Sequence, residues 1–173
     1  MKKRKKQETV NQSEYLQQSC ECSYRCSDLS GKPRKSNGRN KMKKIWITGA
    51  EGHIGTALLD LLEGVEYQLL PTDIEEVDIT KIDEVTQFVH VNRPDVVINC
   101  AGLTDVQECE NNVDEAYRVN AIGVRNVALA ANEVNAKVIQ ISTDDVFDKE
   151  SRVPYNEFDN VHPRTIYGKS KEA

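Results

Sequence analysis

The chain has 173 residues, of which 38% are hydrophobic and 29% charged, and its formal net charge is −5. This composition fits one globular domain with a hydrophobic core and excludes a chain that is disordered throughout. No run approaches the ~20 apolar residues that span a bilayer, and no apolar segment of a secretory signal follows the basic opening. We therefore expect a cytoplasmic protein with no membrane partner.

The first 41 residues differ in character from the rest. They hold 11 basic and 4 acidic residues, whereas residues 42–173 hold 12 basic and 24 acidic ones. They also lack a sustained apolar period, so we expect a disordered basic extension (1–41) ahead of one domain (42–173). The change at Met42 favours this methionine as the natural start. Because the domain is acidic, we expect no nucleic-acid partner.

The cysteines indicate reduced thiols without a metal. Cys20, Cys22 and Cys26 lie close together in the extension, but no histidine or fourth cysteine lies near enough to complete a zinc site. Cys100 and Cys109 are typical of packed thiols in a cytosolic chain. We predict no metal site.

From Met42 onward, apolar strands alternate with helices. In chain order we predict a strand at 44–48, a helix at about 54–62, a strand at about Tyr67–Thr72, an extended piece at 77–79, a helix at about 82–90, a strand at 96–100, a long helix at about 113–135, a strand at 137–142 and a helix starting at Tyr167. This alternation predicts an α/β fold, a doubly wound parallel sheet of the Rossmann type.

A glycine-rich turn joins the first strand to the first helix. It spans Gly49, Ala50, Glu51, Gly52, His53, Ile54 and Gly55. In this context the first glycine permits a tight turn, the second lets the backbone approach a pyrophosphate, and the third allows close packing of helix and sheet. The helix N-terminus adds amide donors. We predict a dinucleotide site here; the alternatives are an ordinary turn, and for His53 simple packing or exposure.

An acidic residue at the end of the second strand indicates which nicotinamide cofactor is bound. Asp73 follows Gly55 by 18 residues, where a carboxylate accepts hydrogen bonds from the adenosine ribose and repels a 2′-phosphate. No arginine lies between Tyr67 and Ile82 to receive that phosphate. NAD(H) is favoured, and NADP(H) stays an alternative.

Five further segments carry a family resemblance. They read NCAGLT (99–104), EAYRVNA (115–121), ISTDDVFD (141–148), PYNE (154–157) and YGKSK (167–171). Together with the glycine turn, they make residues 42–173 resemble the dTDP-4-dehydrorhamnose reductase (RmlD-like) family of the extended short-chain dehydrogenase/reductase superfamily. The resemblance implies an oxidoreductase that uses NAD(P)H to reduce a nucleotide-linked 4-keto-6-deoxy sugar, in dTDP-rhamnose biosynthesis.

The resemblance also implies roles for individual residues. Thr143, Tyr167 and Lys171 match the catalytic triad, Tyr167 and Lys171 also contact the cofactor, and Thr143 and Asp144 meet the substrate. Asp78 and Ile79 match the pair beside the adenine, and Ala101, Gly102 and Leu103 match the loop along the ribose and pyrophosphate. Asn120 matches the asparagine that supports the lysine, with bonding to backbone as its alternative. Asp145 departs from the family, which commonly has an aromatic there, and it would alter contacts near the nicotinamide and sugar.

The chemistry explains why a phenol and an amine are needed. Hydride transfer to a ketone leaves charge on the carbonyl oxygen, so a proton donor must lie within hydrogen-bond reach. A free tyrosine has a pKa of about 10, which a nearby ammonium lowers. Tyr167 and Lys171 are four residues apart and share one face of a helix.

The resemblance implies a longer protein. Relatives continue into a C-terminal domain that holds the nucleotide sugar, whereas this chain ends two residues after Lys171. We therefore expect a domain truncated before its substrate domain, inert by itself, with an open sheet edge that promotes self-association into homo-oligomers. The alternatives are a nucleotide-sugar epimerase or dehydratase, and a non-catalytic NAD(P)-binding regulatory subunit.

Overall fold

A computed structural model describes residues 42–150 and 153–173. The basic extension and its three cysteines lie outside the described residues. The strands are β1 (Lys43–Thr48), β2 (Tyr67–Thr72), β3 (Val96–Asn99) and β4 (Lys137–Gln140). All their pairings are parallel, in the order β2-β1-β3-β4. No helix in the described part of the chain is long and apolar enough to cross a membrane.

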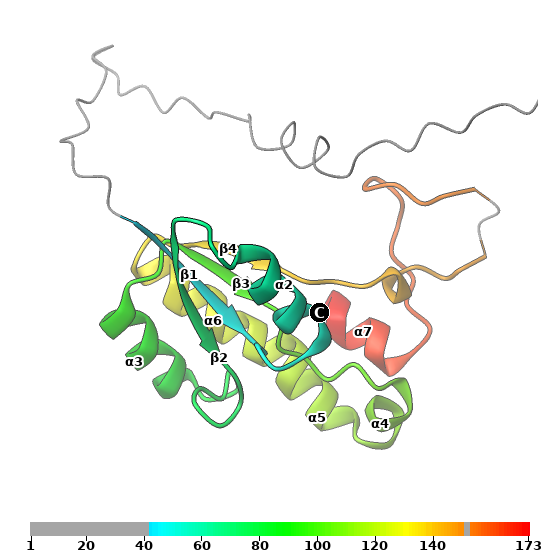
Figure 1. Cartoon of the computed structure of the whole chain (residues 1–173). Coiled ribbons are helices and arrows are strands. Elements are labelled where there is room, and N and C mark those ends of the chain that lie inside the picture. Colours follow the sequence, from blue (N-terminus) through cyan, green and yellow to red (C-terminus); the bar gives the residue numbers. More distant parts are fainter. Residues whose placement is uncertain (1–41, 151–152) are drawn as a thin grey trace, which may run out of the picture. The chain divides into compact units, whose positions relative to one another are not determined.

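Helices connect these strands and cover both faces of the sheet (Figure 1). They are α2 (His53–Leu62), α3 (Ile82–Asn92), α4 (Val106–Asn111), α5 (Val113–Tyr117), α6 (Val124–Glu133) and α7 (Ile166–Glu172). The chain moves from β1 to β2 in one direction and from β2 to β3 in the other. Right-handed crossovers then place α2 on one face and α3 and α6 on the opposite face, which confirms the doubly wound fold.

The main core lies between the sheet and the pair α3 and α6. It consists of nine buried residues: Trp46, Val77, Ile79, Val85, Val89, Val97, Val127, Ala130 and Ala131. The Trp46 ring lies 4.8 Å from that of Phe88, and its indole N–H donates to the Thr72 hydroxyl at 2.9 Å. The predicted extended piece at 77–79 forms no strand among the described residues, but its two apolar side chains enter this core from a loop.

The predicted helix at 113–135 is wrong in two respects. It is interrupted by a π-helical segment at Arg118–Gly123, and α6 ends at Glu133. A π-helical turn holds an extra residue, and here Asn120 and Gly123 within it are buried. Apolar periodicity does not detect such a turn, because the apolar stripe continues on both sides of it.

Two smaller corrections concern the middle of the chain. The short helix α4 was not predicted, because Cys109 is its one buried residue and it shows no apolar period. The sequence feature that could have indicated α4 is its N-cap residue, Asp105, whose carboxylate accepts from the Glu108 N–H at 2.7 Å. The strands predicted at 96–100 and 137–142 end earlier, at Asn99 and Gln140.

The strand β4 forms one edge of the described sheet. Its Val138 and Ile139 side chains are 37% and 49% exposed. Such an edge offers unpaired backbone groups beside apolar side chains, and this is the feature on which self-association was predicted. Self-association stays a prediction.

Candidate functional site

Each of the four strands ends in a polar residue, and these four residues lie side by side at the carboxyl-terminal end of the sheet. Thr72, Thr48, Asn99 and Gln140 are neighbours in register. The Thr48 hydroxyl donates to the Asn99 amide oxygen, and the Asn99 amide nitrogen donates to the Gln140 side chain at 2.7 Å. The first three are buried. Sequence reasoning missed this row, although a polar residue at the end of an apolar strand was its signal.

The glycine turn follows this row directly and is tightly packed. Gly49 has a φ of +63°, which favours glycine, and a side-chain carbon there would lie 2.7 Å from the Ala101 nitrogen. A side-chain carbon at Gly55 would lie 2.2 Å from the Gly49 carbonyl oxygen, so α2 rests against the turn. The Gly52 N–H donates to that same oxygen at 3.2 Å. The predicted tight turn at Gly49 and the predicted close packing at Gly55 therefore fit the observed backbone, and the approach of a pyrophosphate to Gly52 stays a prediction.

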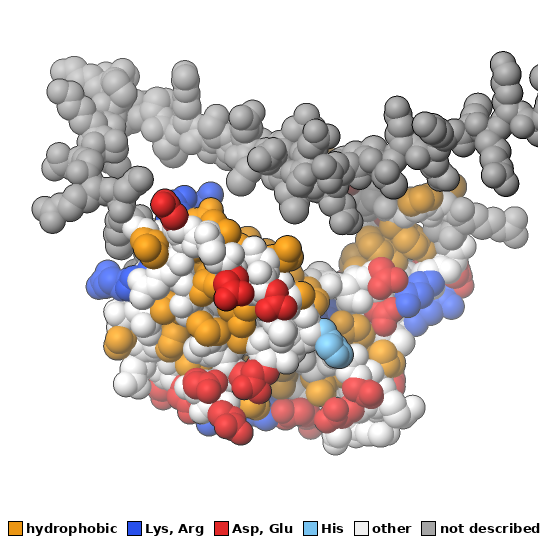
Figure 2. Space-filling model, in the orientation of Figure 1, with side chains coloured by type: hydrophobic (Ala, Val, Ile, Leu, Met, Phe, Trp, Pro, Cys, Tyr) orange, Lys and Arg blue, Asp and Glu red, His pale blue; other side chains and the backbone are white. Residues whose placement is uncertain are grey.

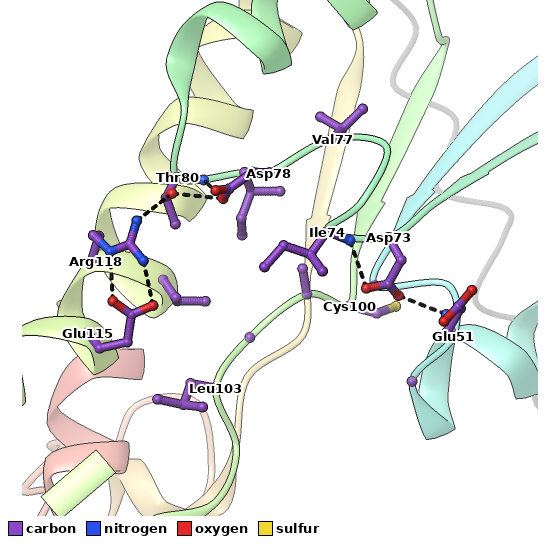
Figure 3. A pocket seen from close by; sticks show the side chains of 16 residues that line it. Glu51, Asp73, Ile74, Val77, Asp78, Thr80, Cys100, Leu103, Glu115 and Arg118 are labelled. Carbon is purple, nitrogen blue, oxygen red and sulfur yellow. Dashed lines mark hydrogen bonds and ion pairs between the residues drawn. The ribbon is translucent and has the colours of Figure 1, made fainter. Parts of the chain in front are cut away.

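A cavity of about 440 Å³ opens beside this turn (Figure 3). Nine predicted cofactor residues line it: Gly49, Glu51, Gly52, Asp73, Asp78, Ile79, Ala101, Gly102 and Leu103. Seven residues that were not predicted complete the lining: Ile74, Val77, Thr80, Cys100, Glu115, Arg118 and Val119. The cavity thus brings together segments that lie up to 70 positions apart in the sequence.

The other predicted residues lie outside this lining. His53 and Ile54 are exposed in the first turn of α2, and Gly55 is buried beneath the turn. Thr143 and Asp144 lie at the 3-10 turn after β4, and Tyr167 and Lys171 lie on α7.

Asp73 connects the end of β2 to the glycine turn. One carboxylate oxygen accepts from the Glu51 N–H at 2.9 Å and the other from the Ile74 N–H at 2.8 Å. The carboxylate is therefore held at the rim of the cavity (Figure 3). Each oxygen has a second lone pair and can still accept a hydrogen bond from a ligand hydroxyl.

A polar network forms the opposite wall (Figure 3). Asp78 accepts from the Thr80 N–H at 2.9 Å and from the Thr80 hydroxyl at 2.7 Å. That hydroxyl accepts from Arg118, which also donates two hydrogen bonds to Glu115 at 2.7 and 2.6 Å. Burial would raise the pKa of Asp78, but the Thr80 hydrogen bonds and the charges of Lys81 and Arg118 outweigh it and hold the pKa below its ordinary value.

The loop at 101–103 is held by Asn120 from the π-helical segment. The Asn120 side chain accepts from the Leu103 N–H and donates to the Leu103 carbonyl, both at 2.9 Å. Lys171 lies beside the same loop. A side-chain carbon placed at Gly102 would be 2.5 Å from its Nζ. Burial lowers the pKa of Lys171, against the opposing effect of the nearby Cys109 and Cys100 thiols.

The 3-10 turn after β4 packs against α7. A side-chain carbon at Gly168 would lie 2.3 Å from the Asp145 carbonyl oxygen, so the turn that carries Thr143 and the helix that carries Tyr167 are in close contact. The Thr143 hydroxyl accepts from the Asp145 N–H at 3.2 Å. The Asp145 carboxylate, which departs from the family pattern, is paired with Lys149.

A family model, curated relatives and solved structures match this chain. Residues 42–173 match the family described as RmlD substrate binding domain. A curated dTDP-4-dehydrorhamnose reductase from Aggregatibacter actinomycetemcomitans is 41% identical over 131 residues, which cover 75% of this chain and 45% of that protein. The chain spans about half the length of the curated relatives it matches.

Solved structures show the same relationship. A dTDP-4-dehydrorhamnose reductase from Clostridium acetobutylicum has a TM-score of 0.74 at 47% identity, covering 75% of this chain and 46% of that one. A dTDP-4-dehydrorhamnose reductase from Bacillus anthracis, solved in complex with NADP, has a TM-score of 0.75 at 43% identity, covering 78% and 48%.

Proposed function

Because this chain belongs to the RmlD substrate binding domain family, we propose that residues 42–173 form the cofactor-binding part of a reductase. The reductase uses NAD(P)H to reduce a nucleotide-linked 4-keto-6-deoxy sugar of the dTDP-4-dehydrorhamnose type. The observation that carries this proposal is the cavity at the carboxyl ends of the strands, where open α/β sheets bind their ligands. Its floor is the left-handed backbone of Gly49 packed on Ala101.

The cavity lining has the groups that a dinucleotide requires. The N-terminus of α2 presents amide donors toward the turn where a pyrophosphate would lie. The Asp73 carboxylate would accept from the ribose hydroxyls, and Asp78 and Ile79 would border the adenine. Ala101, Gly102 and Leu103 would follow the cofactor toward the nicotinamide.

The charge of the lining supports a preference for NADH. Four carboxylates, those of Glu51, Asp73, Asp78 and Glu115, line the cavity, whereas Arg118 is the one basic residue of this lining and is already paired with Glu115. Figure 2 shows acidic side chains gathered along the lower edge of the molecule. A 2′-phosphate would meet this negative field at a cost. The bound NADP of the Bacillus anthracis relative does not support the preference, so the cofactor must be measured on this chain.

The proposed chemistry assigns each catalytic side chain one task. The nicotinamide supplies a hydride when bound. Tyr167 donates a proton to the sugar oxygen, the Lys171 ammonium stabilises the phenolate that remains, and the Thr143 hydroxyl orients the carbonyl. The Asp144 side chain is 85% exposed, so it would contact the nucleotide sugar from the solvent-facing side of the site.

A titration with a matched pair of variants tests the cofactor site. In Gly49→Ala the added carbon meets Ala101, whereas in Gly64→Ala it meets no atom within 4 Å, yet both positions have a positive φ (+63° and +79°). Both variants therefore carry similar backbone strain. We expect the parent chain and Gly64→Ala to bind NADH saturably and Gly49→Ala to lose binding at least tenfold. Equal binding by the two variants would contradict the proposed site.

Turnover separates the enzyme from the other functions. Adding dTDP-4-dehydro-6-deoxy-L-mannose and following NADH absorbance tests reduction, and the expectation that this chain alone is inert stays a prediction until that assay. In a protein of the relatives' full length, NADH oxidation coupled to this sugar supports the reductase. NADH binding without turnover there would favour a regulatory subunit, and interconversion of the sugar without net NADH oxidation would favour an epimerase.

A further inference from the structure

A buried serine connects the cofactor loop to the helix that carries the proposed catalytic pair. Ser170 lies between Tyr167 and Lys171 on α7 and is 0% exposed. Its hydroxyl donates to the Tyr167 carbonyl at 2.8 Å and accepts from the Asn120 amide nitrogen at 2.9 Å. The first bond stays within α7, whereas the second crosses to a segment 50 residues away.

Asn120 has no remaining hydrogen-bond donor for another partner. Its two amide hydrogens go to Ser170 and to the Leu103 carbonyl, and its oxygen accepts from the Leu103 N–H. The residue is 3% exposed; its bond to Ser170 is buried, and its two bonds to Leu103 are partly buried. An unbroken chain of hydrogen bonds therefore runs from the backbone of the cavity-lining loop to the first turn of α7.

This connection matters because α7 is short and depends on contacts with other parts of the fold. The helix spans seven residues, and helices this short are marginal without tertiary contacts. Two other contacts hold α7, the packing of Gly168 on the Asp145 backbone and the hydrogen bond from the Ile166 N–H to Glu110, but neither of them reaches the loop at 101–103. The bond from Asn120 fixes the rotation of α7 at the residue that precedes Lys171, whose Nζ must lie beside Gly102.

We propose that Ser170 is a positioning residue: its hydroxyl ties α7 to the loop at 101–103, so that a cofactor bound along this loop also holds Tyr167 and Lys171 in place. This inference rests on the proposed function. Ser170 acts through Asn120 and does not itself touch cofactor or substrate. By linkage, a ligand that orders the loop stabilises the docked position of α7.

Amide hydrogen exchange of the full 173-residue chain, with and without saturating NADH, tests the proposal. Two segments are followed by mass spectrometry: the glycine turn at 49–55, which reports binding, and α7, which reports docking. The variants are Ser170→Ala, which removes the hydroxyl, and Ser170→Thr, which keeps it. Lys169→Ala is the matched control, because Lys169 is exposed on the same helix.

We expect NADH to slow exchange in both segments of the parent and of Lys169→Ala. In Ser170→Ala, NADH should still protect the turn, while protection of α7 falls by about fivefold, the effect of one lost hydrogen bond. Ser170→Thr should restore that protection.

Four outcomes would overturn the inference. Equal protection of α7 in Ser170→Ala and the parent would show that the hydroxyl does not couple the two segments. A folded Ser170→Thr that behaves like Ser170→Ala would show that a hydroxyl at this position does not restore the coupling. A parent in which NADH protects the turn but not α7 would refute the coupling alone, whereas no NADH effect in either segment would refute the proposed function and the inference together.

Discussion

The hydrogen bonds of Asn99 offer the most direct test of how the strand ends support the site. In Asn99→Ala the Thr48 hydroxyl, which is 1% exposed, loses its acceptor, and the half-buried Gln140 loses a donor. An unsatisfied buried hydroxyl costs about 1–3 kcal/mol, and the cavity left by the amide group adds about 1 kcal/mol. We therefore expect Asn99→Ala to lower the free energy of unfolding by about 3 kcal/mol.

Urea denaturation followed by tryptophan fluorescence measures this loss, because Trp46 is the one tryptophan of the chain and is fully buried. With a slope of about 1–3 kcal/mol per molar urea, the midpoint should fall by roughly 1–3 M. Asn132→Ala, at an exposed position on α6, is the control and should change stability by less than about 0.5 kcal/mol.

A double variant separates the hydrogen bond from the cavity. Replacing both partners by apolar side chains of similar shape, as in Thr48→Val with Asn99→Leu, removes the bond without leaving the hydroxyl unsatisfied. The double variant should be about 1–2 kcal/mol more stable than the sum of its single variants predicts. If Asn99→Ala lies within 1 kcal/mol of the parent, or if the two single variants are additive, the polar row does not stabilise the strand ends as argued.

Three further predictions concern the cavity. Asp73→Asn removes a negative charge from its rim, so the ratio of NADPH to NADH affinity, measured by fluorescence titration, should rise about tenfold, and an unchanged ratio would show that this carboxylate does not select the cofactor. The pKa of Asp78 is lowered in the folded chain, so its hydrogen bonds stabilise the fold above pH ~4 and this contribution disappears as pH falls through the lowered pKa. Thr80→Val should therefore cost about 1–2 kcal/mol at pH 7 and progressively less as the pH falls through the lowered pKa of Asp78 in denaturation experiments, whereas a loss independent of pH would refute this assignment. Burial raises the pKa of Cys100, so its alkylation should be slow at pH 7 and faster above pH 9, and NADH should slow it because Cys100 lines the cavity; peptide mass spectrometry with the buried Cys109 as internal reference checks this.

The parts of the site that were predicted from the sequence are encoded locally. The turn from Gly49 to Gly55 is recognisable because its glycine spacing lies between an apolar strand and a helix. Asp73 is recognisable because it ends the next strand. Both depend on short-range backbone geometry, and parallel pairing of β1 with β2 then brings them together.

The wall of the cavity that carries Thr80, Glu115 and Arg118 was not predicted. Arg118 and Thr80 are 38 residues apart and meet because the π-helical segment begins at Arg118 and lies beside the loop after Val77. No local pattern indicates a π-helical turn or the side chains it would face. The apolar period through this region predicted one uninterrupted helix instead.

Sequence alone thus determined the order of the four strands, the fold class, the glycine turn and the helical spacing of Tyr167 and Lys171, because periodicity and turn chemistry act over a few neighbouring residues. Tertiary structure alone decided that Asn120 joins Leu103 to Ser170, that Thr48, Asn99 and Gln140 form one buried row, and that Arg118 closes the cavity wall. Those contacts depend on strand register and on one extra residue in a helical turn, and both are settled only when distant segments pack and every buried polar group finds a partner.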